Sequence, residues 1–153
     1  MVLALCGTSS SLAQCSGLSP LPINLPINLV VIDQFRAPSC KWCSGNRGIE
    51  YRTEPGSIVT AATGGIASFV GMVAGTNYVV IKTTKTIDNL LVTHGRLQSA
   101  SVKSGAVIAV GQTIGVAGES LYIGVRVNGQ YVDPRQCTGL GSMGKPRAVL
   151  VAG

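Results

Sequence analysis

The side chains that most often carry out catalysis or hold metals are scarce in this chain of 153 residues, which has one histidine, six acidic residues and five cysteines. The most suggestive stretch is residues 45–50, Gly-Asn-Arg-Gly-Ile-Glu. A histidine in place of Asn46 and an aspartate in place of Glu50 would make half of a zinc site. The amide of Asn46 is only a weak neutral ligand. We therefore interpret the stretch as part of a fold built for metal chemistry that has lost it.

No other set of residues forms a catalytic constellation. His94 has no obvious partner, and we expect it to be a partly buried polar residue at the end of a strand rather than a ligand or an acid–base group. Ser120 follows Gly-Glu, which is not the nucleophile elbow of a serine hydrolase. We expect Glu50 to form an ordinary ion pair with Arg47.

The cysteines suggest disulfides in an exported protein. Residues 1–13 are interpreted as a signal segment, because an apolar stretch is followed by small residues that suit signal peptidase, and Cys6 would leave with it. Two disulfides can then form in three pairings, of which we favour Cys40 or Cys43 with Cys137. A thioredoxin-like role is not supported, because no strand-helix-strand pattern surrounds Cys40 and Cys43. A four-cysteine zinc knuckle is not supported either, because Cys15 and Cys137 lack partner cysteines at knuckle spacing. The cysteines in question are Cys15, Cys40, Cys43 and Cys137.

The sequence predicts an all-β protein, a compact sandwich or barrel of short, mostly antiparallel strands. Short runs rich in β-branched residues are separated by glycine-containing turns, and no stretch keeps a helical apolar period. Asn128-Gly129 is a strong hairpin signal before residues 130–132. The predicted strands are residues 29–35, 49–52, 58–62, 66–70, 78–83, 89–93, 107–110, 121–127 and 130–132.

Two segments repeat the same local pattern. Residues 55–62 and 103–110 each place a glycine two residues before a β-rich pair, which suits a duplicated hybrid motif. The flanks differ from this core. Residues 14–41 hold two Leu-Pro-Ile-Asn units, expected to form an extended strap and an entry strand, and residues 135–153 are a tail. Trp42 is expected to plug an edge of the core.

Composition restricts the partners. The formal charge of +6 favours an anionic partner, although the basic residues are scattered and also suit a solvated surface. Aromatic residues make up 5% of the chain, too few for a stacking platform for nucleic acid. No apolar run approaches the roughly 18 residues of a membrane span.

These features resemble the LytM/lysostaphin-type murein metallopeptidase family, and the exported actinobacterial branch in particular. The match covers residues 42–134, which we expect to be the peptidase-like domain. It is carried by five separated pieces in the family's order, namely residues 46–50, 55–65, 102–115, 121–125 and Val132-Asp133-Pro134. The resemblance implies a duplicated hybrid β-motif.

The resemblance also implies which positions should hold zinc, and there the chain departs from the family. The ligand positions carry Asn46, Glu50 and Tyr122, and the assisting histidines are replaced by Arg96 and Ser120. Only Glu50 is a competent ligand at neutral pH, so no metal or other cofactor is expected. We expect Asn46 and Tyr122 to hydrogen-bond to each other and close the cleft.

The leading hypothesis is therefore a secreted or envelope-bound, non-catalytic domain that binds peptidoglycan or a wall hydrolase in an inherited groove. The candidate groove residues are Asn46, Arg47, Glu50, His94, Arg96 and Tyr122. The alternative is an active zinc endopeptidase that cleaves peptidoglycan cross-links. Lipoyl or biotinyl carriers and sugar-phosphotransferase domains have related folds, but the chain lacks the flanked lysine or the paired histidines that they need.

Overall fold

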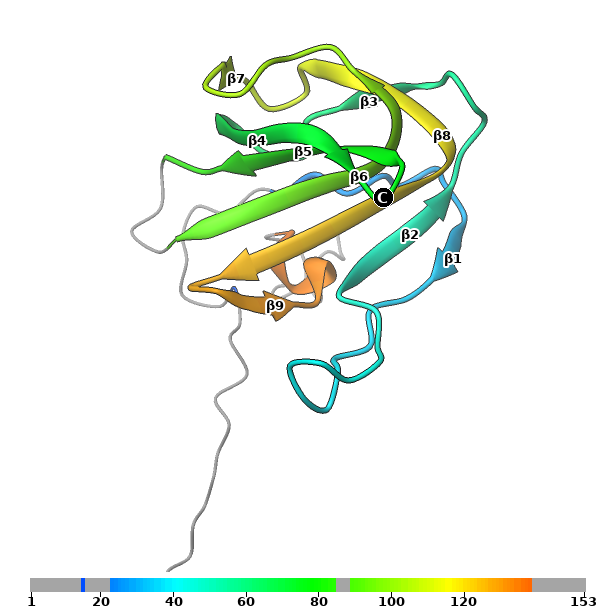
Figure 1. The fold of residues 1–153 in the computed structure, drawn as a ribbon, viewed down its shortest axis with the longest axis vertical. Coiled ribbons are helices and arrows are strands. Elements are labelled where there is room, and N and C mark those ends of the chain that lie inside the picture. Colours follow the sequence, from blue (N-terminus) through cyan, green and yellow to red (C-terminus); the bar gives the residue numbers. More distant parts are fainter. Residues whose placement is uncertain (1–14, 16–22, 85–88, 139–153) are drawn as a thin grey trace, which may run out of the picture.

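The structure is a computed structural model that describes residues 15, 23–84 and 89–138. These residues form one open antiparallel sheet and a short 3-10 helix, η1 (Figure 1). The strands are β1 Val31–Asp33, β2 Gly48–Arg52, β3 Ile58–Thr60, β4 Gly65–Val73, β5 Thr76–Lys82, β6 Leu90–Ala100, β7 Val107–Ile108, β8 Thr113–Val127 and β9 Gln130–Val132, with η1 at Pro134–Cys137. The predicted all-β class is confirmed.

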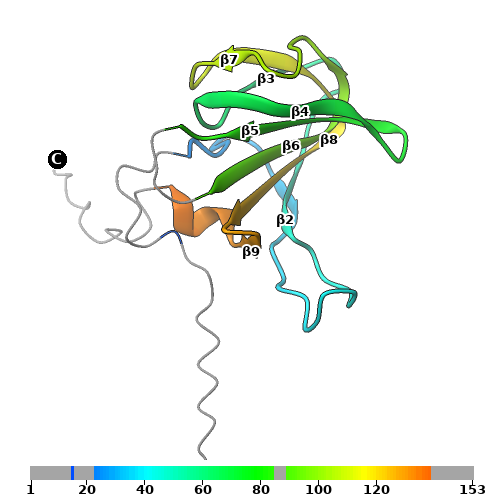
Figure 2. The ribbon, with the colours of Figure 1, turned by 60° about the vertical axis from the view of Figure 1, so that its left-hand side comes forward.

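The long strand β8 organises the sheet. Strand β6 pairs with β8 along almost its whole length, from Leu90 opposite Val127 to Ala100 opposite Gly115. The other edge of β8 is shared by β3, β2 and β9 in turn. The strand order is β1-β2-β8-β6-β5-β4-β7, and the sheet curls so that β3, β4 and β7 gather at one end (Figures 1 and 2).

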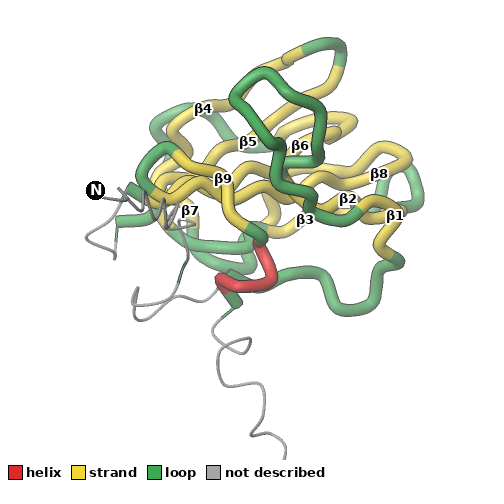
Figure 3. Tube along the Cα trace, turned by 90° about the horizontal axis from the view of Figure 1, so that it is seen from below, coloured by secondary structure: helices red, strands yellow, loops and turns green. Residues whose placement is uncertain are grey.

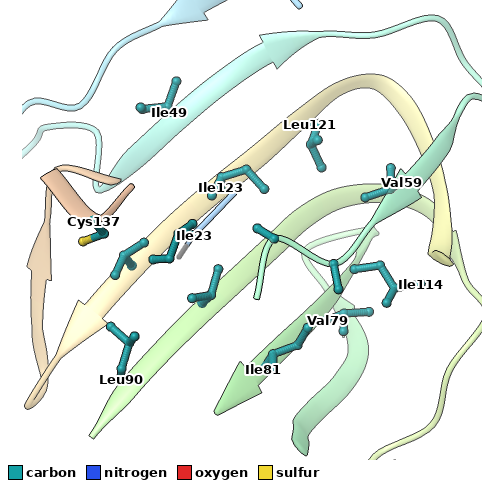
Figure 4. Close-up of a cluster of buried hydrophobic side chains, with 14 of the residues drawn as sticks. Ile23, Ile49, Val59, Val79, Ile81, Leu90, Ile114, Leu121, Ile123 and Cys137 are labelled. Atoms are coloured by element: carbon teal, nitrogen blue, oxygen red, sulfur yellow. The ribbon is translucent and has the colours of Figure 1, made fainter. Parts of the chain in front are cut away.

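Alternation of side chains along β8 separates the core from the opposite face. Leu121, Ile123, Val125 and Val127 are buried and join the apolar cluster drawn in Figure 4. Because successive side chains of a strand point to opposite faces, the residues between them lie on the other side of the sheet. We call that side the outer face. It carries Tyr122, Gly124 and Arg126 of β8 and their neighbours on β2, β6 and β9.

The predicted strands all occur with somewhat different bounds, and β6 and β8 extend furthest beyond their predicted ends. Strand β6 continues past Gly95 through a register shift at Arg96, whose φ of 62° is unusual for a residue with a side chain. Strand β8 begins at Thr113 rather than 121. The two half-motifs also appear: Gly56 and Gly105 turn the chain with φ values of 88° and 89° before β3 and β7.

The disulfides are Cys15–Cys137 and Cys40–Cys43, so our preferred pairing of Cys40 or Cys43 with Cys137 is wrong. Cys43 is close enough along the chain to close a tight turn with Cys40, and the Cys43 amide donates to the Cys40 carbonyl at 3.1 Å. Cys137 lies on η1, which follows β9 (red in Figure 3), and is fully buried. Near it Ile23 enters the core, and its amide donates to the Cys137 carbonyl.

The predicted signal segment, strap and tail stay predictions. Residues 1–14, 16–22 and 139–153 lie outside the described chain. Nothing in the described part of the chain forms a helix long and apolar enough to cross a membrane.

His94 is a core residue, not the partly buried strand-end residue that we predicted. It lies within β6, is fully buried, and bridges two parts of the fold. Its Nε2 accepts a hydrogen bond from the Ala62 amide at 2.9 Å, and its Nδ1 lies 3.3 Å from the Val79 carbonyl, to which it donates. Burial lowers the pKa of His94 from 6.5 to about 4, because the charged imidazolium would lose its hydration. The ring is therefore neutral in the folded protein near pH 7.

This burial predicts a pH dependence of stability. His94 takes up a proton near pH 6.5 in the unfolded chain but only near pH 4 in the folded chain. Between these two pH values the unfolded chain binds more protons, so the free energy of unfolding is highest above pH 6.5 and decreases as the pH falls from 6.5 to 4. We expect about 3 kcal/mol of unfolding free energy to be lost between pH 7 and pH 4 from this group. Urea denaturation followed by circular dichroism measures it.

His94→Gln is the matched variant, because a glutamine amide can donate to the Val79 carbonyl and accept from the Ala62 amide but does not titrate. Its stability should depend less on pH than that of the wild type by about that amount. Parallel pH profiles for the two proteins would contradict this assignment.

Candidate functional site

On the outer face, the Tyr122 ring lies over three glycines, Gly48, Gly95 and Gly124, which we call the glycine floor. In the sheet register, Tyr122 of β8 lies opposite Glu50 of β2 and Gly95 of β6, and Gly124 lies opposite Gly48. A Cβ added at Gly124 would lie 2.6 Å from the Tyr122 hydroxyl oxygen, and one added at Gly48 would lie 2.6 Å from two carbons of the same ring. The Tyr122 ring therefore lies directly on the strand backbones, and only glycine leaves room for it.

Tyr122 is a poor metal ligand in this setting. Burial is the largest cause that raises the pKa of its phenol, and the neighbouring Tyr131, Tyr78 and Glu50 raise it further, while Arg47 opposes them. The phenol thus stays protonated over the whole neutral range. Its ring occupies the middle of the outer face.

Glu50 is neutralised by Arg96 rather than by Arg47. The Arg96 Nη2 donates to Glu50 Oε1 at 2.9 Å, and the Glu50 side chain is 16% exposed. The predicted pairing of Glu50 with Arg47 is wrong because the shift at Arg96 aims that side chain across β8 toward β2. Arg47 instead donates to the carbonyls of Lys41 and Cys43.

Both polar atoms of the Asn46 side chain form hydrogen bonds with backbone groups. Its Nδ2 donates to the Gln34 carbonyl at 3.0 Å, and its Oδ1 accepts from the Gly48 amide at 3.3 Å. Within the described residues no hydrogen bond joins Asn46 to Tyr122, so the predicted Asn46–Tyr122 contact is wrong. Asn46 instead fastens the start of β2 to the chain that follows β1, where it also pairs with Arg36.

The structure brings together most of the residues singled out from the sequence. Glu50, Arg96, Tyr122 and Ser120 gather on or beside the outer face, with Arg47 near Tyr122 and Asn46 at the entry to β2. His94 does not belong to the group. It pairs with the core residue Ile123 and faces the opposite side of the sheet, so it cannot line a groove on the outer face.

Sequence reasoning missed a cluster of two arginines around Tyr131. The guanidinium carbon of Arg126 lies 5.6 Å from the centre of the Tyr131 ring, and that of Arg47 lies 5.9 Å from it. Arg126 and Tyr131 are direct partners across the β8–β9 hairpin. The Asn-Gly turn that predicted this hairpin could have predicted that pair, whereas nothing in the sequence indicated the approach of Arg47.

Trp42 does not plug the core as predicted. It is 86% exposed at the tip of the turn closed by Cys40–Cys43, and Lys41 Nζ lies 5.0 Å from the centre of its ring. The loop that carries it, between β1 and β2, projects from the sheet (Figure 2).

The residues at the three positions that the resemblance assigns to zinc, Asn46, Glu50 and Tyr122, do not fit a hydrolytic zinc ion. Such a site needs about three imidazole or carboxylate ligands and an open position for water. Here an amide is tied to the backbone, a carboxylate is paired with arginine, and a phenol has a raised pKa. Among the residues that the structure describes, no three histidine, cysteine, aspartate or glutamate side chains form a group suited to a metal.

Comparison with known proteins gives a consistent result. Residues 44–134 match the sequence model of peptidase family M23. No curated protein matches the chain. Among solved structures, the catalytic domain of the prophage-encoded M23 protein EnpA from Enterococcus faecalis is similar, with a TM-score of 0.60 and 22% identity over 74% of this chain and 95% of that one.

Two further structures extend the comparison. Csd3 from Helicobacter pylori has a TM-score of 0.64 and 22% identity over 74% of this chain and 32% of its own length, so this chain spans about a third of it. The catalytic domain of the antimicrobial peptidase lysostaphin from Staphylococcus simulans has a TM-score of 0.59 and 17% identity over 70% of this chain and 90% of that one. At these identities the similarity establishes a shared fold.

The glycine floor predicts which substitutions the outer face tolerates. Gly48→Ala would drive a methyl group into the Tyr122 ring and, closer still, into the Ile123 carbonyl, which cannot move away. We expect a loss of about 1–3 kcal/mol in the free energy of unfolding. Gly118→Ala is the control, because its nearest contact would be 3.3 Å. Equal stability of the two variants in urea denaturation would show that the Tyr122 ring does not rest on this floor.

Proposed function

The chain belongs to peptidase family M23, and we propose that it is a non-catalytic member that acts at the cell envelope by binding peptidoglycan. The observation that carries the proposal is the ion pair between Arg96 and Glu50. Glu50 is the one carboxylate at the three ligand positions, and its charge is already neutralised by a residue of the chain itself. A metal would have to displace that arginine and would still find no imidazole on this face.

Location at the cell envelope is supported by the cysteines. Four of the five cysteines form disulfides, and such bonds persist in oxidising compartments outside the cytoplasm. The predicted signal segment at residues 1–13 and the actinobacterial character of the motifs agree with export, as parts of the same proposal.

Binding on the outer face is supported by its surface chemistry. Tyr78, Tyr122 and Tyr131 line it together with Arg47 and Arg126, and the glycines beneath Tyr122 let its ring lie flat on the strands as an aromatic surface for a ligand. Aromatic rings and arginines are the side chains that contribute most to recognition surfaces. The chain also carries a net charge of +6, which favours an anionic polymer such as a cell wall.

A partner protein is the second candidate ligand. One similar structure, with a TM-score of 0.60 and 17% identity, comes from a complex of SpoIIIAH and SpoIIQ, so the fold occurs in a protein assembly. For this chain the corresponding partner would be a wall hydrolase.

The catalytic alternative makes an opposite prediction about zinc. We expect the protein, purified without a histidine tag and dialysed against dilute zinc, to retain less than one zinc per chain by elemental analysis. The variant Asn46→His/Glu50→Asp/Tyr122→His restores the donor types that a zinc site needs and serves as the positive control. Stoichiometric zinc in the wild type would overturn the non-catalytic assignment and revive the endopeptidase.

Wall binding is tested by sedimentation with purified murein sacculi. We expect the protein to sediment with sacculi without releasing soluble fragments. Ser120→Trp places a bulky ring on the outer face and should weaken binding by about tenfold or more. Ser101→Trp, at an exposed position just after β6, is the control. Absence of wild-type sedimentation would direct the search to the partner protein.

A further inference from the structure

Among the residues that the structure describes, the cluster of Arg47, Tyr131 and Arg126 holds two positive charges, and no carboxylate forms an ion pair with either of them. Three ion pairs occur among the described residues, and each joins another arginine to its carboxylate: Arg36 to Asp33, Arg96 to Glu50 and Arg135 to Asp133. Arg47 and Arg126 take part in none of them. Two guanidinium groups that share one aromatic ring repel each other, so an anion between or beside them would stabilise the cluster.

Arg126 supplies a second and independent sign of an incomplete site. Its Nε is buried, and within the described chain this is the one buried side-chain nitrogen or oxygen without a hydrogen-bond partner. The Tyr131 ring attracts the cation but offers no lone pair to the N–H group. Leaving a buried charged donor unpaired is costly. Because the Nε is closed to solvent in this structure, a ligand oxygen would remove that cost only if the Arg126 side chain turned the Nε outward.

Arg47 is held in place before any ligand arrives. Its Nη2 donates to the Lys41 carbonyl at 2.9 Å and to the Cys43 carbonyl at 3.5 Å. Both carbonyls belong to the turn that Cys40–Cys43 closes. A guanidinium fixed in this way loses little conformational entropy when it binds, which is the physical basis of preorganised recognition.

We propose that Arg126, Tyr131 and Arg47 form a binding site for a carboxylate at the end of a peptide that lies on the outer face. With its Nε turned outward, Arg126 would present the Nε and one Nη as a planar fork that matches the two oxygens of a carboxylate. The site lies beside Tyr122, whose ring covers the glycine floor and offers a surface on which the rest of a short peptide with small side chains can lie. This deepens the proposed function, on which it rests, because murein stem peptides end in free carboxylates.

The test compares two probes that differ only in the group concerned, acetyl-D-Ala-D-Ala with a free carboxylate and the same dipeptide as a carboxamide. Binding is followed by NMR through the arginine Nε–H signals and the Tyr131 ring. We expect the acid to bind at least about tenfold more tightly than the amide, since charge-assisted hydrogen bonds are the stronger kind. Equal affinity for acid and amide, or no saturable shift with either, would overturn the proposal.

Three variants test which arginines produce the preference for the acid over the amide. Arg126→Lys keeps the charge but removes Nε, and Arg47→Gln removes the second cation; each should abolish most of the preference for the acid. Arg52→Gln removes the same charge from the opposite end of β2 and should leave the preference intact. If Arg126→Lys kept the full preference, the fork at Arg126 would not be the binding group.

Glycerol phosphate at matched ionic strength is the competing anion. Tighter binding of glycerol phosphate than of the acid would overturn the proposal and identify a phosphate site. The sacculus experiment reports separately on the proposed function. If the protein sediments with sacculi but binds acid and amide equally, only the carboxylate site is contradicted. If it prefers the acid but does not sediment with sacculi, the carboxylate site stands and peptidoglycan binding is contradicted.

Discussion

The period-two alternation of β8 is the constraint on which the rest of the structure depends. Its buried members, Leu121, Ile123 and Val125, fix the register against β2 and β6, and that register in turn places Tyr122 and Arg126 on the outer face. A slip of one residue would exchange the two sets and destroy both core and site at once. The hydrophobic core therefore determines where the polar residues of the face meet, even though it touches none of their charged groups.

The same principle explains what the sequence could and could not predict. Strands with alternating or β-branched residues, and the Asn128-Gly129 turn, were predictable because their signals are local. The full length of β6 and β8 was not, since Gly95, Gly115 and Gly118 resemble strand ends. Close approach of neighbouring strands explains one of them: a Cβ at Gly115 would lie 3.1 Å from the Ala100 Cα.

The contacts of the site were harder to predict than its members. The resemblance identified Asn46, Glu50, Arg96 and Tyr122 as positions of interest, and the structure gathers Glu50, Arg96 and Tyr122. The partner of Glu50 depended on the positive φ of Arg96, and the Cys15–Cys137 disulfide depended on where Cys15 meets η1, neither of which leaves a pattern in the sequence. His94 was misplaced because a lone histidine on a strand gives no sign of the face it occupies.

The exposed turn that carries Trp42 has a consequence for spectroscopy. Trp42 is the only tryptophan of the chain and lies almost wholly in water, outside the core. Its fluorescence in the native protein should already resemble that of a solvated indole, so unfolding would change it little. Anything that covers the loop would instead move the emission toward shorter wavelength. The chain thus contains a built-in optical probe that reports occupancy of one loop and is nearly silent about the integrity of the fold.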